Sequence, residues 1–290
     1  MTVRTVSLQE IVGKNYADFW RDKHRYRVCK GSRGSKKSKT TALNLIVRMM
    51  QHPQSNALVM RRTYTTLRDS CYSDLKWAIN RLGVSHLWKC VENPLEIRFI
   101  PTNQRILFRG FDDALKITSI SVPTGVLCWV WIEEAYEVTD EDAFNKLDMS
   151  IRGEMPEGLF KQITLTFNPW SAQSWLKARF FDTPDPDVFT KTTTYKCNEW
   201  LDASDLAIFE KMRVNNPRRY RIEGLGEWGV AEGLIYDKVD LQPFDIQSLR
   251  EQDNIKAVFG LDFGFTDPTA FAAIMIDEVN QKLYVFDEYY

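Results

Sequence analysis

Residues Gly31 to Ser38 have the residue types and the spacing of a phosphate-binding loop, and they read Gly-Ser-Arg-Gly-Ser-Lys-Lys-Ser. Lys37 comes six positions after Gly31 and Ser38 follows it, but Lys36 stands where the motif has its second glycine. In such a loop the backbone N–H groups hold phosphate, the lysine reaches the β- and γ-phosphates, and the serine hydroxyl ligates Mg²⁺. We therefore predict nucleotide binding here, with a flexible Gly/Ser/Lys surface loop as the alternative. The predicted nucleotide-binding residues are Gly31, Ser32, Arg33, Gly34, Ser35, Lys36, Lys37, Ser38 and Lys39.

A second group of chemistry-bearing residues, Glu133 and Glu134, comes directly after the apolar run Val126 to Ile132. Two adjacent carboxylates at the end of a buried strand are costly unless a cation compensates them. Next to a phosphate-binding loop, Glu133 would hold the water shell of Mg²⁺, and Glu134 would be the base that polarises the attacking water. The alternative is that both acids belong to the first turn of a helix, where the helix dipole favours them.

Two further motif matches lack the sequence context that their function needs. Asn145-Lys-Leu-Asp148 copies the guanine-recognition tetrapeptide of GTPases, but it lies inside a helical pattern and no Asp-x-x-Gly precedes it. Asp262-Phe-Gly264 copies a protein-kinase triplet, but the sequence has no His-Arg-Asp catalytic loop. We therefore expect neither a GTPase nor a kinase.

The elements that must position these residues follow a βα alternation. Apolar runs that predict strands are Tyr26 to Cys29, Ala57 to Met60, Ile106 to Phe108, Val126 to Ile132 and Ile163 to Phe167. Helical patterns cover Thr40 to Gln51, Thr66 to Leu82 and Asp140 to Asp148. This order predicts an α/β fold with a mostly parallel sheet covered by helices on both faces.

The last third of the chain has a different pattern. Residues 200–229 read as a polar helical segment, and three apolar runs follow at Ala257 to Phe263, Ala270 to Ile276 and Lys282 to Phe286. These runs predict the start of a new sheet. About thirty residues are too few for an independent domain, so we expect either a truncated chain or a hairpin that packs on the first domain.

Composition excludes several classes of protein. The 290 residues are 44% hydrophobic and carry a formal net charge of −1, so global charge gives no reason to infer a polyanion partner. The five cysteines are scattered without paired spacing, which argues against disulfides and zinc. No apolar run has the length of a membrane span. We expect a soluble protein of the cytoplasm.

Five motifs in order resemble the large terminase subunit of tailed bacteriophages, and the resemblance covers nearly the whole chain. They are Gly31 to Thr41, Val130-Trp-Ile-Glu-Glu-Ala135, Leu165-Thr-Phe-Asn-Pro169, Gly226-Glu-Trp-Gly229 and Gly260-Leu-Asp-Phe-Gly-Phe-Thr-Asp-Pro268. The nearest branch of that family commonly has glycine at the position of Lys36, so this departure concerns loop geometry and turnover.

The resemblance implies an ATP-hydrolysing motor of the P-loop NTPase (ASCE-type) class that translocates double-stranded DNA into a procapsid, with ATP and Mg²⁺ as cofactors. It implies a P-loop ATPase domain over residues 1–195, a lid or linker over 196–250, and from 251 to 290 the start of a truncated RNase H-like nuclease domain. The implied partners are double-stranded DNA, the small terminase subunit, the portal protein and further copies of the chain in a ring on the portal, in the host cytoplasm with no membrane.

The resemblance also implies roles for single residues. Arg33 matches the P-loop arginine that senses or stabilises the γ-phosphate, so the implied catalytic residues are Glu134, Arg33 and Lys37. Thr166 and Asn168 match the coupling motif, and ordinary turn chemistry is the alternative for both. Asp262 matches the first metal-binding acid of the nuclease, which would use Mg²⁺ or Mn²⁺ with acids on later strands, so we expect this chain not to cut DNA.

Three other positions have open interpretations. Phe19 and Trp20 fall where relatives place an adenine-contacting segment, but core packing is the commoner fate of such a pair. Arg61 and Arg62 follow a strand end and could face DNA or phosphate, or be solvated. For the whole chain, the alternatives are a helicase or recombination-type P-loop ATPase and a nucleotide-binding module without turnover.

Overall fold

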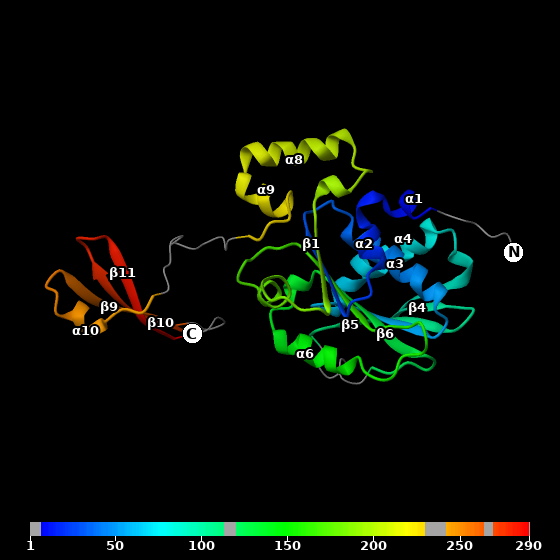
Figure 1. The fold of residues 1–290 in the computed structure, drawn as a ribbon, viewed down its shortest axis with the longest axis horizontal. Coiled ribbons are helices and arrows are strands. Elements are labelled where there is room, and N and C mark those ends of the chain that lie inside the picture. The colour runs from blue at the N-terminus through cyan, green and yellow to red at the C-terminus, as the bar shows by residue number, and fades with distance from the viewer. Residues whose placement is uncertain (1–6, 113–119, 230–241, 264–268, 290) are drawn as a thin grey trace. The chain divides into compact units, whose positions relative to one another are not determined.

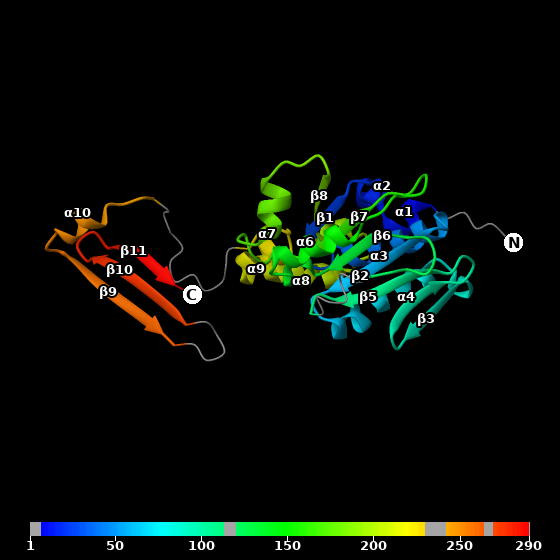
Figure 2. The ribbon, with the colours of Figure 1, turned by 90° about the horizontal axis from the view of Figure 1, so that it is seen from below.

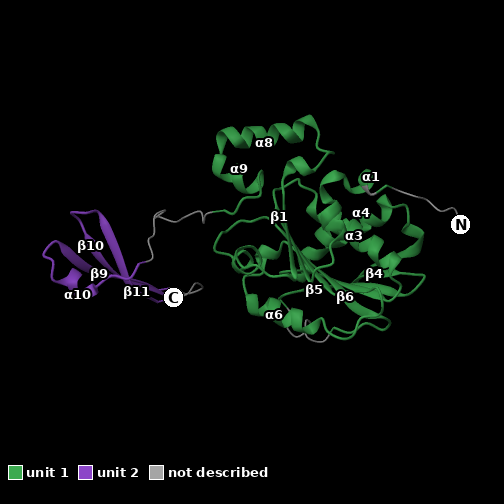
Figure 3. Ribbon diagram, viewed as in Figure 1, with its two compact units in different colours: residues 1–232 green, residues 233–290 purple. Residues whose placement is uncertain are grey.

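The computed structural model describes residues 7–112, 120–229, 242–263 and 269–289. The chain forms two compact units, residues 1–232 and residues 233–290, which Figure 3 colours separately. Residues 264–268, which include Asp267 and the end of the fifth motif, lie outside the described residues. Within the described ranges, no helix is long and apolar enough to cross a membrane.

The first unit is built on an 8-stranded sheet in the order β3-β4-β5-β2-β6-β7-β1-β8, which can be followed in Figure 2. All neighbours from β5 to β8 pair in parallel, and only β3 and β4 pair antiparallel at one edge. The predicted α/β class with a mostly parallel sheet is therefore confirmed. The strands are β1 (Tyr26–Gly31), β2 (Ser55–Arg61), β3 (Trp88–Glu92), β4 (Leu95–Phe99), β5 (Gln104–Gly110), β6 (Val126–Glu133), β7 (Gln162–Phe167) and β8 (Val188–Thr193).

The central strands β2, β6 and β7 are buried on both faces at nearly every position. In β6, Trp129 and Trp131 belong to one hydrophobic cluster, whereas Val130 and Ile132 belong to the other. Successive side chains of a strand point to opposite faces, so each face needs its own cover. Helices α3 and α4 cover one face and α6 covers the other (Figure 1).

The helices of the first unit differ at their ends from the sequence patterns. The predicted helix from Thr40 begins earlier, at Lys37, and the pattern from Thr66 is divided into short 3-10 and π-helical turns before α4. The helices are α1 (Leu8–Val12), α2 (Ala17–Arg21), α3 (Lys37–Gln51), α4 (Ser73–Arg81), α6 (Glu141–Ser150), α7 (Trp175–Lys177), α8 (Ala203–Asn215) and α9 (Pro217–Glu223). The short turns are η1 (Lys14–Tyr16), η2 (Tyr64–Leu67), η3 (Arg68–Tyr72), η4 (Ser85–Leu87), η5 (Ala135–Glu137), η6 (Ala178–Asp182) and η7 (Tyr195–Cys197).

The polar segment after β8 forms the helix pair α8 and α9. Asp202 caps α8 with a capping box, and Asn216 with Pro217 begins α9, which are common signals for helix starts. A small core of its own holds this pair, since Tyr195 stacks on Phe209 with 4.1 Å between ring centroids. The helix pair α8 and α9 is therefore an ordered element that follows β8.

The second unit contains helix α10 (Ile246–Arg250) and a 3-stranded antiparallel sheet in the order β11-β10-β9. Its strands are β9 (Ile255–Asp262), β10 (Ala270–Asp277) and β11 (Lys282–Tyr289). These positions correspond to the three apolar runs seen in the sequence.

Candidate functional site: a nucleotide cavity at the carboxyl edge of the sheet

Three central strands deliver the predicted residues to one edge of the sheet. β1 ends at Gly31, β6 ends at Glu133 and β7 ends at Phe167, and the pairing sets Glu133 opposite Thr166. Because these strands are parallel, their carboxyl ends lie at the same edge, which is where α/β sheets bind ligands. The loop from β1 to α3 lies across that edge.

Lys36 adopts the left-handed backbone conformation, with φ 61° and ψ 23°, directly before α3. Glycine enters this region without strain, which explains the glycine of the motif, whereas a residue with a Cβ is strained there. The Lys36 side chain turns to Glu199, with which it forms an ion pair, and its Nζ lies 4.2 Å from the centroid of the Trp200 ring. The loop therefore keeps the backbone turn of the motif while the Lys36 ammonium is bound elsewhere.

The side chain of Lys37 folds back under the loop. Its Nζ donates to the carbonyl oxygens of Ser32 at 2.8 Å and Gly31 at 3.3 Å, and to Ser35 Oγ at 3.4 Å. Burial lowers the pKa of Lys37 below its ordinary value, and the charges of Glu133 and Glu134 oppose that shift. A cation that borders the cavity and is only partly compensated is well suited to an anionic ligand.

Glu133 is the centre of a hydrogen-bonded group at the end of β6. Ser38 Oγ donates to Glu133 Oε1, Thr166 Oγ1 donates to Glu133 Oε2, and Trp131 Nε1 lies 3.2 Å from the same Oε2. Burial, followed by the charge of Glu134, raises the pKa of Glu133 above its ordinary value. The Ser38 hydroxyl and the Glu133 carboxylate are thus adjacent oxygen ligands of the kind that Mg²⁺ prefers.

Glu134 is held differently from its neighbour. It has a positive φ of 51°, and its Oε2 is buried without a hydrogen-bond partner among the described residues. Burial raises the pKa of Glu134, while the charges of Lys37 and Arg61 lower it. A strained backbone and an unpaired carboxylate oxygen together are typical of a functional position.

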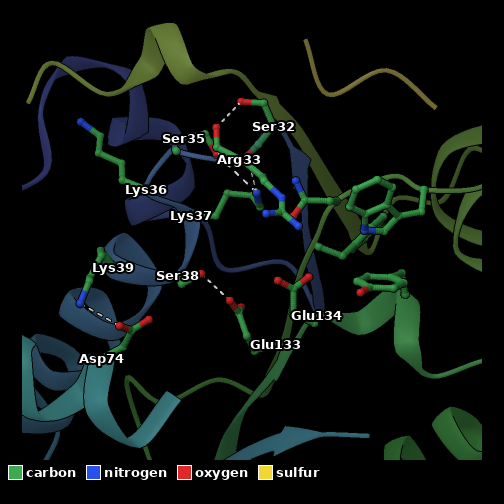
Figure 4. A pocket seen from close by; sticks show the side chains of 15 residues that line it. Ser32, Arg33, Ser35, Lys36, Lys37, Ser38, Lys39, Asp74, Glu133 and Glu134 are labelled. Atoms are coloured by element: carbon green, nitrogen blue, oxygen red, sulfur yellow. Dashed lines mark hydrogen bonds and ion pairs between the residues drawn. The ribbon is translucent and has the colours of Figure 1, made fainter. Parts of the chain in front are cut away.

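These groups line one cavity of about 490 Å³ (Figure 4). Of the predicted residues, Ser32 to Lys39, Glu133, Glu134 and Asn168 line it. Gly31 and Thr166 support it from behind, since the Gly31 carbonyl accepts from Asn168 Nδ2 at 2.8 Å. In Figure 4, Arg33 points toward the middle of the cavity and Lys36 points away from the acidic pair.

The structure adds residues that sequence reasoning missed. Asp74, Tyr136 and Trp170 also line the cavity, and Asp74 forms an ion pair with Lys39 at 2.8 Å. The α9 end holds the loop from outside, because the Arg33 N–H donates to the Glu223 carbonyl at 2.9 Å. Tyr136 lies two residues after Glu134, and Trp170 lies two residues after Asn168, so their closeness in sequence to predicted site residues could have indicated them. The sequence contains no such indication for Asp74 or Glu223.

Several other predicted residues lie outside this cavity. Phe19 is fully buried in the core, and the Arg27 guanidinium packs 4.0 Å above the centroid of its ring. Arg61 pairs with Glu137 at 2.8 Å, and Arg62 is exposed. The GTPase-like tetrapeptide lies inside α6, where Asp148 accepts hydrogen bonds from Arg25 and Tyr26.

Asp262 is the last residue of β9 and is exposed. Within the described ranges, no three His, Cys, Asp or Glu side chains are grouped closely enough to hold a metal ion. A nuclease role for Asp262 therefore stays a prediction.

The family described as phage terminase large subunit matches residues 23–227. This chain belongs to that family. A curated relative, "Terminase, large subunit" of Bacillus phage SPP1, is 33% identical over 99% of this chain and 69% of its own length. A solved large terminase from a thermophilic bacteriophage has the same fold, with a TM-score of 0.61 and 20% identity over 97% of this chain and 67% of that chain. The same thermophilic phage protein in complex with ATP-γ-S matches with a TM-score of 0.58 and 20% identity, over 93% of this chain and 66% of that one. In this terminase, the matched range thus contains the whole cavity.

Proposed function

We propose that this terminase chain binds ATP with Mg²⁺ in the cavity and hydrolyses it to translocate double-stranded DNA into a procapsid. The observation that carries the proposal is that Lys37, Ser38, Glu133 and Glu134 line a single cavity at the carboxyl edge of a parallel sheet. The ATP-γ-S complex of the thermophilic phage's large terminase, which shares the fold, supports the choice of nucleotide. The family supports the choice of the packaging reaction.

The loop binds the phosphates by charge and by its backbone N–H groups. Lys37, which now donates to carbonyl oxygens of the loop, turns toward the β- and γ-phosphates when they are present. Arg33 reaches the γ-phosphate from the loop itself, where a guanidinium neutralises charge that develops in the transition state. The chain thereby holds the triphosphate with both side-chain cations.

Ser38 would ligate Mg²⁺ through its hydroxyl, and Glu133 would hold the water shell of the ion through its carboxylate; these two groups are bonded to each other in this structure. When bound, the ion neutralises the phosphate oxygens and orients the γ-phosphate. Glu134 acts as the base. Its unpaired Oε2 accepts the proton of the water whose oxygen attacks the γ-phosphorus, while the bond to the bridging oxygen of ADP breaks.

Thr166 and Asn168 couple this chemistry to motion. Thr166 is bonded to Glu133, and Asn168 is bonded to the carbonyl of Gly31 at the start of the loop. Loss of the γ-phosphate changes the charge around Glu133 and Arg33, and Thr166 and Asn168 transmit this change along β7.

The proposed partners are double-stranded DNA, the small terminase subunit, the portal protein and a ring of identical chains. Asp262 is proposed to be a metal-binding acid of a nuclease that uses Mg²⁺ or Mn²⁺.

A pair of substitutions tests the proposal. Lys37→Ala removes a phosphate ligand and is expected to lower ATP affinity by at least tenfold. Glu134→Gln keeps the shape of the side chain and is expected to bind ATP normally, while DNA-stimulated release of phosphate falls by 100-fold or more, on the order of the loss of a general base. Lys211→Ala and Glu157→Gln change exposed side chains of the same types and serve as controls.

The outcomes separate the alternatives. Normal hydrolysis by Glu134→Gln would refute the assigned base. ATP binding by the wild type without DNA-stimulated hydrolysis would select a nucleotide-binding module, and unwinding of a forked duplex would select a helicase. The left-handed backbone of Lys36, which keeps the turn of the motif, favours turnover over the binding module.

A further inference from the structure

A second cavity, of about 230 Å³, borders the phosphate cavity. The two share Lys36 and Lys39 in their walls, so they are neighbours along the phosphate-binding loop. The remaining wall is formed mainly by Leu43, Trp77, Arg81 and Trp200. A cavity suited to phosphate and a cavity with aromatic walls therefore adjoin at the start of α3.

Trp77 and Trp200 are unusual because they are large aromatic side chains left exposed, by 37% and 53% respectively. They come from elements far apart in the sequence, α4 and the segment between η7 and α8. Each ring has a cation over its face, since Lys39 Nζ lies 4.4 Å from the Trp77 centroid and Lys36 Nζ lies 4.2 Å from that of Trp200. Exposed aromatic faces beside cations are suited to a flat, aromatic ligand that carries phosphate.

The direction of a bound nucleotide is set by the phosphate cavity. In the proposed ATP site the γ-phosphate lies toward Glu134, so the α-phosphate and the nucleobase would lie on the opposite side of the loop. Figure 4 shows Lys36 and Lys39 on that opposite side, which is where the second cavity begins. Phe19 cannot stack on a base, because it is fully buried beneath Arg27.

We propose that the cavity lined by Trp77 and Trp200 binds the nucleobase of the nucleotide by stacking, a proposal that rests on the proposed ATP site. Its charged wall residues, all within the described part of the chain, are Lys36, Lys39 and Arg81, and no carboxylate is among them. The Asn198 side-chain amide donates to the Gly34 carbonyl and accepts from the backbone N–H of Trp200. The site therefore recognises the ring area of a purine more than its hydrogen-bonding edge. ATP and GTP should bind within about tenfold of each other, and CTP and UTP more weakly.

Comparison of ATP with inorganic tripolyphosphate isolates the contribution of the base. Calorimetric titration with each, in the presence of Mg²⁺, is expected to show that wild-type protein binds ATP more tightly. Trp77→Ala and Trp200→Ala should each weaken ATP binding by about tenfold, within the range for loss of one stacking face, and leave tripolyphosphate binding unchanged. Trp200→Phe should recover most of the lost affinity.

Two controls keep the outcomes distinct. Ile208→Ala removes a different exposed apolar side chain, which lies on α8 and is 59% exposed, and should alter neither titration. Trp20→Phe should also leave ATP binding unchanged. Equal losses of ATP and tripolyphosphate in the tryptophan variants, or no loss of ATP, would overturn the nucleobase site alone. Failure of the wild type to bind either ligand would overturn the ATP site together with it.

Discussion

Lys36 offers a sharp test of the phosphate-binding loop, because it combines a strained backbone with a well-bound side chain. Its φ of 61° costs a residue with a Cβ about 1–2 kcal/mol relative to the right-handed region. The side chain, only 7% exposed, regains part of that cost through the ion pair with Glu199 and the contact with Trp200. Each of these two contacts is worth about 0.5–1 kcal/mol.

Two substitutions separate the backbone from the side chain. Lys36→Ala keeps the strain and loses both contacts, so the free energy of unfolding should fall by about 1–2 kcal/mol. Lys36→Gly loses the same contacts but relieves the backbone strain. The greater freedom of glycine in the unfolded chain reduces the resulting gain in stability by about 0.4–1 kcal/mol. The glycine variant should therefore be more stable than the alanine variant by about 1 kcal/mol, and should lie near the wild type.

Urea unfolding of the three proteins measures the effect, with the midpoint as readout and an unchanged slope as the check on two-state behaviour. Glu199→Gln should reproduce only the ion-pair part of the side-chain loss, about 0.5–1 kcal/mol, without touching the loop backbone. An alanine variant as stable as the glycine variant, or more stable, would refute the left-handed conformation at this position. An unchanged midpoint in Glu199→Gln would refute the energetic role of the ion pair.

Three further perturbations have defined outcomes. Thr166→Val removes one of the two donors to Glu133 Oε2, the other being Trp131 Nε1, and should lower the free energy of unfolding by about 1–3 kcal/mol in urea, so an unchanged midpoint would contradict the hydrogen bond. Gly226 has φ 67°, and the Cβ added by Gly226→Ala would lie 2.8 Å from Gly31 Cα, so both the melting temperature and the ATP affinity should fall. A variant in which both are unchanged would rule out this close approach. Burial lowers the pKa of Lys30 to about 8, so between pH 8 and about 10.4 the unfolded chain binds more protons than the folded chain. The wild type should therefore gain stability relative to Lys30→Met as the pH rises through this range. A difference in melting temperature between the two proteins that stays constant with pH would refute this.

Much of the fold followed from the sequence because the central strands contain short apolar runs that are typical of buried strands. β2 and β6 contain the continuous apolar runs Ala57 to Met60 and Val126 to Ile132, which predict them without knowledge of their neighbours. β7 alternates apolar residues with Thr164 and Thr166, and all of its residues are buried. The edges of the sheet gave weaker signals. β8, for example, reads Val-Phe-Thr-Lys-Thr-Thr with alternating partial exposure, and its pairing with β1 defines it as a strand.

The chemistry of the site was written in short local patterns. Ser38 next to Lys37, and Glu134 next to Glu133, have their roles through residue type and position relative to one strand or one turn, which are properties that neighbours in sequence determine. The same holds for the lysine in the place of glycine. The sequence could not show how the Lys36 side chain is accommodated, since its partners Glu199 and Trp200 lie more than 160 residues away.

The sequence by itself determined which residue types stand at the strand ends and therefore which chemistry the chain can support. Only the tertiary structure decided that these ends meet in one cavity, that Asp74 lines it while Glu223 holds its loop from outside, and that Trp77 and Trp200 line a second cavity beside it. The physical reason is that a strand or turn is encoded by its own residues, whereas a cavity forms between elements whose contact depends on the packing of the whole sheet and its helices.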